Sequence, residues 1–545
     1  MSRIPVRTQL YVLVALLVLV AFTQRWAQDD AYVTFRYSKH VVDGLGPVWN
    51  RDYAVEGYTD FLWMVCVAVG LKLGLSAEAA SYAFSLPSFA IPLLIVFDLG
   101  RRVLPNERWA LLATWLSGTT YSFLMYATGG LETQLHAMLV LGIIDLVLRT
   151  RQEGNAPPKR MLGLSLLMAL ALMARPDSVV PSAIAGGFVL FTLLFPKPVA
   201  AGAGARANPW LSLACLILPA VALVLPWLLW KLSFYGDIVP NTFYTKLGLH
   251  RSATLVRGAV YVSWLFISYW WLPLIVLIAI RARKLLLSLV SPLFVLIVYA
   301  GAWLGYVTWV GGDLMEFRLL TSVIPIVILL MLAVFSATAP SPRLTAALVV
   351  VMLLGSVSHG LAFPKYVNPR GIDTIPGLQE NAAKFREVGE RLGADLRGRG
   401  EVTIAVSPAG FIPYFSEART IDVLGLNDRW VSREGFVRTG CNVCLGHARL
   451  ATFAYMNQSG VNLILAHPQW AHEKLACARR DDIMKGMLWG EPIDYQNLPP
   501  ATKIVAVPLS AEPFRELIAL YSKPQPGIDA LIASGTWRVL PECSK

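Results

Sequence analysis

The sequence predicts an all-α membrane domain of about eleven transmembrane helices, followed by a water-facing α/β domain. Of the 545 residues, 56% are hydrophobic and 15% are charged, and the mean hydropathy is +0.55, which is too apolar for a soluble globular protein of this length. Apolar runs recur as far as residue 363, and from Pro364 onward charged residues return between short β-rich runs. We therefore expect two domains, residues 1–363 and 364–545.

Apolar runs of roughly 17 to 25 residues are long enough to cross the hydrocarbon core of a bilayer. The candidates lie near residues 8–26, 80–100, 108–126, 131–149, 161–175, 178–196, 209–231, 258–280, 285–309, 319–338 and 342–362. No cleavage site of small residues follows the first run, so we expect a retained anchor and not a signal peptide.

Basic residues in short loops predict the orientation of the helices. Arg3 and Arg7 place the N-terminus in the cytoplasm, and Arg101 belongs on the same side. Asp29 then lies outside, so the chain must cross the membrane an odd number of times between Asp29 and Arg101. Two apolar runs lie in this interval, and one of them cannot span. The short run 61–75 is therefore expected to lie in the membrane interface. The other basic loop residues obey the same rule: Arg102, Arg108, Arg149, Arg151, Lys159, Arg160, Lys197, Arg206, Arg281, Arg283, Lys284 and Arg343.

This topology describes a multi-pass protein of the cytoplasmic (inner) membrane whose 364–545 domain is extracytoplasmic. The opposite topology would put nearly all of the basic clusters outside. The net charge of +12 does not indicate nucleic-acid binding, because many Lys and Arg residues stand in short loops beside apolar runs.

Four of the six cysteines lie in the expected outer domain: Cys441, Cys444, Cys477 and Cys543. On the outside of a membrane such cysteines are candidates for disulfides, and the sequence leaves their pairing open. The alternative is a zinc site, because Cys441 and Cys444 with His447 nearby form half of a zinc motif, but a second pair of ligands is missing.

The stretch from Gln28 to Asp60, within the loop 27–60, carries the strongest functional signal. Asp29 and Asp30 stand where the first helix reaches the interface, and ionisable groups at membrane depth are costly. If the segment is helical, Asp29 and Arg36 share a face that points into one cavity. The alternative is an interfacial helix with solvated charges. Glu56 and Tyr58 follow in a turn-rich, aromatic segment that is suited to line a cleft.

Four further polar motifs fall on the same side of the membrane. Glu132 in TGGLET either caps the following helix or contacts substrate. Arg175 and Asp177 in ARPDS either belong to the site or form only a local ion pair.

The other two motifs are basic and aromatic. The segment FYGDIVPNTFYTKLGLHR suits a lipid-linked phosphate, with a merely interfacial loop as the alternative; it contains Asp237, Asn241, Tyr244, Lys246 and His250. In WVGGDLMEFRLL, Asp313 precedes Arg318, whose guanidinium can bind a phosphate bidentately. A transporter would more naturally place polar groups at mid-membrane and on both sides.

Taken in order, the motifs resemble the GT-C glycosyltransferases, which are membrane enzymes that use polyprenyl-phosphate sugars. The resemblance covers most of residues 27–330 and is to the terminal arabinofuranosyltransferase branch of mycobacteria and corynebacteria. It is carried by DDAYVTFRYSKHVVDGLGPVWN, VEGYTDFLW, GLET, ARPD, YGDIVPNTFYTK and GGDLMEFRLL. The segment SPAGFIPYFSEARTIDVLGLND in the outer domain is also similar to one in this branch.

The resemblance implies an inverting transfer of a pentose, most simply arabinofuranose, from decaprenyl phosphate to a cell-envelope glycan outside the membrane. It implies that Asp29 or Asp30 is the catalytic base, and our hypothesis assigns Asp29. The implied donor residues, which bind the phosphate or the lipid, are Arg36, Lys246, Arg318, Tyr244, Asn241 and His250. The implied acceptor or sugar residues are Glu56, Tyr58, Glu132, Arg175, Asp177, Asp237 and Asp313.

Several alternatives stay open. One is a protein of a different class, a transporter or flippase of lipid-linked saccharide. Another is a GT-C enzyme that uses another sugar or a pilin-like protein acceptor, and a third is a non-enzymatic protein that anchors wall glycan. We expect a monomer whose partners are membrane lipid, the polyprenyl-phosphate donor and the acceptor. The sequence identifies no cofactor with certainty, and a divalent cation shared by Asp29 and Asp30 is left open.

Overall fold

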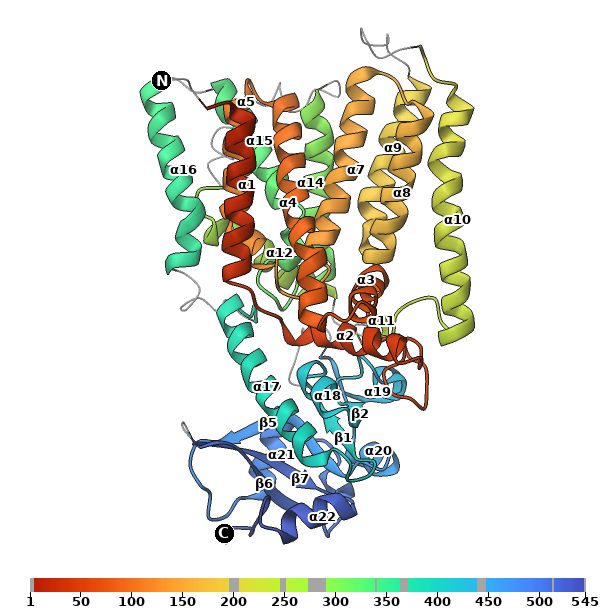
Figure 1. The fold of residues 1–545 in the computed structure, drawn as a ribbon, viewed down its shortest axis with the longest axis vertical. Helices are drawn as coiled ribbons and strands as arrows, with labels where there is room; N and C mark the ends of the chain where they lie inside the picture. The colour runs from red at the N-terminus through yellow and green to blue at the C-terminus, as the bar shows by residue number, and fades with distance from the viewer. Residues whose placement is uncertain are drawn as a thin grey trace.

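The protein consists of a helical bundle with an α/β domain at one of its ends (Figure 1). The computed structural model describes residues 4–195, 205–245, 251–272, 291–338, 341–362, 371–438, 447–511 and 514–543. The N-terminus lies at the free end of the bundle and the C-terminus in the α/β domain, at the opposite end of the molecule. We call the end of the bundle that meets the α/β domain the domain-bearing end.

Among the described residues, ten helices stand side by side along the bundle (Figure 1). They are α1 (Val6–Thr23), α4 (Ala77–Val103), α5 (Glu107–Thr119), α7 (Thr133–Glu153), α8 (Pro158–Ala174), α9 (Val179–Leu194), α10 (Pro209–Tyr235), α14 (Pro292–Val310), α15 (Ile324–Thr338) and α16 (Pro342–Ala362). Among the described residues, seven helices are long and apolar enough to cross a membrane: α1, α4, α7, α9 with the turn before it, α10, α14 and α16. The chain is therefore a multi-pass membrane protein.

The helices differ in the share of their residues that is buried inside the protein, and this difference shows which helix is central. In α7, 78% of the most apolar window is buried inside the protein, against 11% in α10. Helix α7 is thus the central helix of the bundle, whereas α10 packs mainly on α8 and leaves its other faces for lipid.

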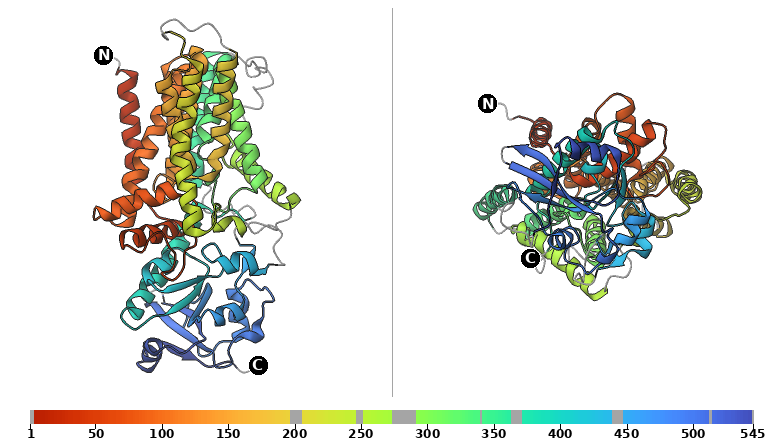
Figure 2. Two further views of the ribbon diagram at one scale, coloured as in Figure 1. Left: turned by 90° about the vertical axis from the view of Figure 1, so that its right-hand side faces the viewer. Right: turned by 90° about the horizontal axis from the view of Figure 1, so that it is seen from below.

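The other described helices of residues 1–363 gather at the domain-bearing end. They are α2 (Asp29–Val42), α3 (Phe61–Lys72), α6 (Tyr121–Met125), α11 (Asn241–Tyr244) and α12 (Arg251–Ser268), together with the 3-10 turns η1 (Pro176–Ser178) and η2 (Arg318–Leu320). The 12 residues of α3 span only about 18 Å, too little to cross the hydrocarbon core. Figure 2 shows α2 and α3 lying across the axis of the bundle, the orientation expected of helices in a membrane interface.

The expected span at 258–280 is only partly described, since residues 273–280 lie outside the described ranges. Its described part belongs to α12, which packs on elements of the domain-bearing end. A Cβ at Gly258 would lie 2.1 Å from the carbonyl oxygen of Thr308 in the last turn of α14. The Tyr261 hydroxyl donates to the carbonyl of Met315 at 3.0 Å. As far as it is described, this segment lies against that end and does not run through the bundle.

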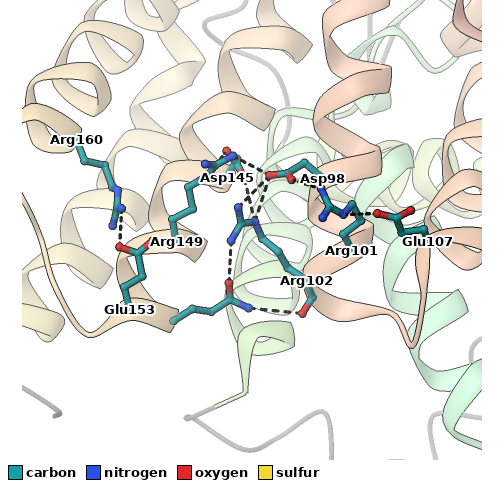
Figure 3. A network of polar contacts seen from close by, with 9 residues as sticks. Asp98, Arg101, Arg102, Glu107, Asp145, Arg149, Glu153 and Arg160 are labelled. Carbon is teal, nitrogen blue, oxygen red and sulfur yellow. Dashed lines mark hydrogen bonds and ion pairs between the residues drawn. The ribbon is translucent and has the colours of Figure 1, made fainter. Parts of the chain in front are cut away.

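The opposite end of the bundle carries a network of ion pairs (Figure 3). Arg102 and Arg149 each contact both Asp98 and Asp145, with the shortest separation 2.7 Å between Arg149 and Asp98. Arg101 pairs with Glu107, and Arg160 with Glu153. Basic residues that the sequence suggests for orienting the helices therefore also connect α4, α5, α7 and α8.

The α/β domain begins with the long helix α17 (Ile375–Leu396) and is built on a six-stranded sheet in the order β2-β1-β5-β7-β6-β8. Strands β1 (Thr403–Val406), β2 (Arg419–Asp422) and β5 (Leu463–Ala471) pair in parallel, whereas β6 (Lys503–Ala511), β7 (Phe514–Tyr521) and β8 (Arg538–Leu540) are antiparallel. Strands β3 (Phe436–Val437) and β4 (Arg449–Leu450) form a separate pair.

Shorter helices surround the sheet: α18 (Phe411–Ser416), α19 (Arg429–Glu434), α20 (Phe453–Gln458), α21 (Arg480–Met487), η3 (Tyr495–Asn497) and α22 (Pro526–Ala533). Figure 1 shows that α18 and α19 lie against the bundle, while α22 lies on the side of the α/β domain that is remote from the bundle. A disulfide joins Cys477 to Cys543 with a Cα separation of 5.1 Å. Cys441 and Cys444 lie outside the described residues.

Candidate active site

Helix α2 brings the two adjacent carboxylates to the junction between bundle and α/β domain. Both lie in its first turn, where the partial positive charge of the helix N-terminus favours acidic side chains. Asp29 is half-buried, and its two carboxylate oxygens accept hydrogen bonds from the backbone N–H groups of Phe411 at 2.8 Å and Gly410 at 3.1 Å. Asp30 is exposed. The neighbouring carboxylates therefore have different surroundings.

Asp30 faces the charges of the bundle, although its side chain is accessible to solvent. Burial of its surroundings raises the pKa of Asp30; the charge of Arg318 lowers it, and Asp313 and Glu132 raise it. Burial and the charge of Asp30 together raise the pKa of Asp29 to about 7, against the effect of the two backbone hydrogen bonds. Asp30 is thus a solvent-accessible carboxylate within electrostatic reach of Arg318, Asp313 and Glu132, and we call these four residues the charged cluster.

Arg318 stands at the start of η2, in the loop between α14 and α15. Its guanidinium Nε donates to Asp313 at 2.8 Å, and the two side chains are 17% and 13% exposed. Only one guanidinium nitrogen is engaged in this bond, so the geometry leaves the group able to bind an anion as well.

Arg175 joins the two predicted acidic residues on the neighbouring helices. It donates to Glu132 at 2.5 Å and to Asp177 at 2.7 Å. Glu132 occupies the N-cap position of α7 but makes no capping hydrogen bond with its side chain. Of the two roles open in the sequence, the capping role is therefore not realised, and Arg175–Asp177 is part of a three-residue cluster.

A second group of predicted residues lies outside the charged cluster. Among them, Arg36 donates to the carbonyl oxygens of Trp49 at 3.0 Å and Ala418 at 2.9 Å, and to that of Pro413. Asn241 donates to the carbonyl of Gly425 at 2.8 Å. These side chains attach the domain-bearing end to the α/β domain.

The remaining members of this group are also bonded to protein. Asp237 accepts from the Tyr244 hydroxyl at 2.6 Å and from Arg433 at 3.1 Å. Glu56 pairs with Lys231 at 2.8 Å, and the Tyr58 hydroxyl lies 3.1 Å from that of Tyr235. Lys246 and His250 lie outside the described residues.

Three ionisable residues near these groups escaped the sequence predictions: Lys231, His359 and Asp60. Lys231 is the single charged side chain of the apolar helix α10, and His359 lies in the last turn of the apolar helix α16, far from Arg343 in its first turn; this isolation is the signal that would have revealed them. His359 pairs with the buried Glu316 at 2.9 Å. Asp60 accepts from Thr34 at 3.0 Å, and burial followed by the charge of Glu132 raises its pKa.

Beside the Asp313–Arg318 loop lies a cavity of about 540 Å³. It is lined mostly by α12 and by the residues next to the loop: Ser252, Ala253, Val256, Arg257, Val260, Leu314 and Gly371. Arg257 donates to the carbonyls of Gly311, Asp313 and Gly371. Within the described ranges, no group of three or more His, Cys, Asp or Glu side chains is placed to hold a metal ion.

Solved structures similar to this one identify the fold. The structure of ArnT from Cupriavidus metallidurans bound to undecaprenyl phosphate aligns with a TM-score of 0.53 and 12% identity, covering 94% of this chain and 97% of that one. Arabinofuranosyltransferase AftD from Mycobacteria aligns with a TM-score of 0.51 and 13% identity over 96% of this chain and 42% of that one. The fold is therefore that of the GT-C glycosyltransferases.

Two proteins similar in sequence have a more narrowly defined activity than the structural neighbours. A terminal beta-(1->2)-arabinofuranosyltransferase of Mycobacterium tuberculosis is 24% identical over 271 residues, which is 47% of this chain and 40% of the relative. Its namesake in Corynebacterium glutamicum is 25% identical over 337 residues, which is 55% of this chain and 46% of the relative. The chain thus spans less than half the length of these relatives, and the resemblance predicted from its motifs is confirmed. Residues 375–509 also match a domain of unknown function, DUF8728.

Proposed function

We propose that this protein is an inverting glycosyltransferase that moves a pentose, arabinofuranose, from polyprenyl phosphate to a glycan of the cell envelope. The observation that carries the proposal is a solvent-accessible carboxylate, Asp30, within electrostatic reach of the guanidinium of Arg318. The similarity to terminal arabinofuranosyltransferases supports the choice of sugar.

In the proposed reaction, Asp30 takes the proton of the acceptor hydroxyl while that oxygen bonds to the anomeric carbon of the sugar. The bond between this carbon and the donor phosphate breaks, and its electron pair leaves on the polyprenyl phosphate. Arg318 stabilises the phosphate charge. Glu132, Arg175, Asp177 and Asp313 line the sugar or acceptor side.

Asp30 replaces Asp29 as the proposed base for a geometric reason. Each oxygen of Asp29 accepts a backbone hydrogen bond, whereas Asp30 is exposed and under the influence of Arg318. Arg36 and Asn241 are left out of the proposed site for the sugar donor, because their N–H groups already donate to backbone carbonyl groups. Lys246 and His250 remain proposed phosphate ligands, and decaprenyl phosphate remains the proposed carrier.

The cavity beside the Asp313–Arg318 loop is proposed to hold the first part of the isoprenoid chain. Val256, Val260 and Leu314 give it apolar walls, and it adjoins the loop that carries the proposed phosphate ligand. A lipid in this position would bring its phosphate toward Arg318 while its tail stays among apolar side chains.

The test is transfer by the purified protein from radiolabelled decaprenyl-phosphate arabinose to an arabinan oligosaccharide. Asp30→Asn should lower the rate about 100- to 10,000-fold, the range that a general base contributes. Asp482→Asn, an exposed residue of α21, is the matched control and should leave the rate unchanged. Full activity of Asp30→Asn would exclude this assignment.

A panel of polyprenyl-phosphate sugars identifies the donor in the same assay, and a pilin-like acceptor tests a protein substrate. Movement of the lipid-linked sugar across proteoliposomes without acceptor would instead support the alternative of a transporter. Addition of EDTA, followed by Mg²⁺, tests whether a divalent cation takes part.

A further inference from the structure

Helix α2 presents two different faces to its surroundings. Asp29, Tyr32, Arg36 and Lys39 recur at the helical spacing that forms one stripe, and all four contact the 410–418 segment of the α/β domain. Thr34, on another face, donates to Asp60 at 3.0 Å. The helix that carries Asp30 is thus held from the side of the α/β domain.

The contacts along this stripe are of several kinds. The Tyr32 ring stacks on Phe411 with a centroid distance of 4.0 Å. The buried Arg36 bonds to carbonyl groups of Pro413 and Ala418, and Lys39 forms an ion pair with Glu417. Together with the two hydrogen bonds to Asp29, these contacts engage nearly three turns of α2.

Gly410 allows the closest approach in this contact. A Cβ built on it would lie 1.8 Å from the carbonyl oxygen of Asp29 and 2.7 Å from its carboxyl carbon. Since the nearest atom is backbone, no side-chain rotation relieves the overlap. Any other residue at this position must push α2 and the α/β domain apart.

The α/β domain also contacts the Asp313–Arg318 loop, through the residues at the start of α17. The N–H of Glu316 donates to the carbonyl of Asp373 at 3.0 Å, and the N–H of Asp373 donates to the carbonyl of Leu314 at 2.6 Å. The buried carboxylate of Glu316 accepts from the N–H of Ile375 at 3.0 Å. Leu314 and Glu316, the loop residues that form these bonds, lie between Asp313 and Arg318 in the sequence.

Building on the proposed function, we infer that the α/β domain is the positioning element of the reaction centre. Segment 410–418 holds the helix of Asp30, and segment 373–375 holds the loop of Arg318, so one domain sets the separation of the two groups. Gly410 and Glu316 are positioning residues, since they act through the elements that they hold. The arrangement in which the α/β domain contacts both α2 and the Asp313–Arg318 loop, which we call the docked arrangement, is the one in which the enzyme catalyses transfer.

Gly410→Ala tests the first of these contacts. A displacement of about 1 Å at a reacting group can cost about 100-fold in rate, so kcat should fall about 100-fold. The KM for the donor, whose proposed phosphate ligand Arg318 lies on a different loop, should stay within about twofold. The rate is expressed per bound decaprenyl phosphate, which removes any contribution of unfolded protein. Gly186→Ala is the control, because nothing lies within 4 Å of a Cβ at that helical position. Unchanged kcat in Gly410→Ala would overturn the inference.

Hydrogen exchange provides a readout that does not depend on activity. In the full-length protein the N–H groups of Gly410 and Phe411 should exchange slowly, and in Asp29→Ala they should exchange at least tenfold faster. This result separates the two proposals: a wild-type protein without transferase activity contradicts the proposed function, whereas equal exchange in both proteins contradicts the positioning contact.

Cross-linking tests whether the docked arrangement is the working one. A Lys39→Cys/Glu417→Cys variant is linked by a short, thiol-cleavable bis-maleimide, with each single-cysteine variant treated alike. The linked enzyme should keep its rate within about twofold. If linking abolishes transfer and cleavage restores it, the domain must leave α2 during turnover and the inference is wrong.

Discussion

Asp29 and Asp30 are neighbours in the chain, yet a helix turns successive side chains by about 100° and gives them different partners. The backbone N–H groups of the α/β domain bind Asp29, whereas Arg318 and Glu132 act on Asp30. Two residues of the same type are thereby separated into one that attaches a domain and one that is free for chemistry.

The electrostatic link between Asp30 and Arg318 predicts a pH effect. Arg318 lowers the pKa of Asp30, so Arg318→Gln should raise that pKa. A base must be ionised to work, and the rate is lost as the pH falls through its pKa. The acid limb of the kcat profile should therefore move to higher pH in Arg318→Gln, in addition to a lower maximum rate. Steady-state rates between pH 5 and pH 9 measure it.

Arg51→Gln is the control for this experiment. Arg51 is exposed at the same end of the bundle, and its loss should leave the profile where it is. An acid limb of Arg318→Gln that coincides with that of the wild type would show that Asp30 does not titrate in the rate-limiting step.

Some residue-scale predictions placed a side chain at the correct end of the molecule without finding its partner. Arg36 was expected to share a cavity with Asp29, but it meets carbonyl groups more than 370 residues away in the chain. Periodicity tells which face of a helix a residue occupies; it carries no information about the distant segment that covers this face.

At the scale of elements, charge counting was enough to identify α3 as a helix that does not cross the membrane. The argument needs only the side of the flanking residues, and this is a local property. Hydropathy and length counted the run at 258–280 as a span, although its described part packs on Thr308 and Met315 at the domain-bearing end. Hydropathy does not distinguish a buried helix at the bundle end from one that crosses.

The buried pair of Glu56 and Lys231 fastens the loop after α2 to the end of α10. The two side chains are 4% and 2% exposed. Lys231→Met leaves a buried carboxylate without its partner, which should destabilise the protein by about 3–5 kcal/mol. The thermal unfolding temperature in detergent should fall, and it should recover in the double variant Glu56→Gln/Lys231→Met.

The deficit of Lys231→Met should also depend on pH. Burial raises the pKa of Glu56 to about 7 even with Lys231 present, and removal of Lys231 raises it further. The folded protein then holds a proton that the unfolded chain releases above about pH 4.5. Stability is therefore lost as the pH rises, and the deficit should be larger at pH 8 than at pH 5. Lys384→Met, which breaks an exposed pair with Glu380, is the matched control.

At the scale of the whole molecule, the polar groups of the candidate site lie at the end where the bundle meets the α/β domain. The opposite end holds the ion-pair network of Asp98, Arg102, Asp145 and Arg149 (Figure 3). This asymmetry fits an enzyme that works at one membrane surface and not a carrier with a site at mid-membrane.

The proposed orientation puts the α/β domain outside the cytoplasm. Alkaline phosphatase fused after Lys545 should be active, and green fluorescent protein fused there should be dark. A cysteine at Gln152, beside the ion-pair network, should react with a membrane-impermeant maleimide only after the cells are opened. The reverse pattern would invert the topology.

The sequence by itself determined the membrane class, the interfacial helix, the α/β domain and the group of motifs that resemble arabinofuranosyltransferases. All of these depend on local composition, charge or the order of motifs. Only the tertiary structure decided that Asp29 binds Gly410 and Phe411, that Glu132 joins Arg175, and that Glu316 meets the start of α17. Such contacts join segments that are far apart in the chain, and their partners are chosen by packing, which no local pattern encodes.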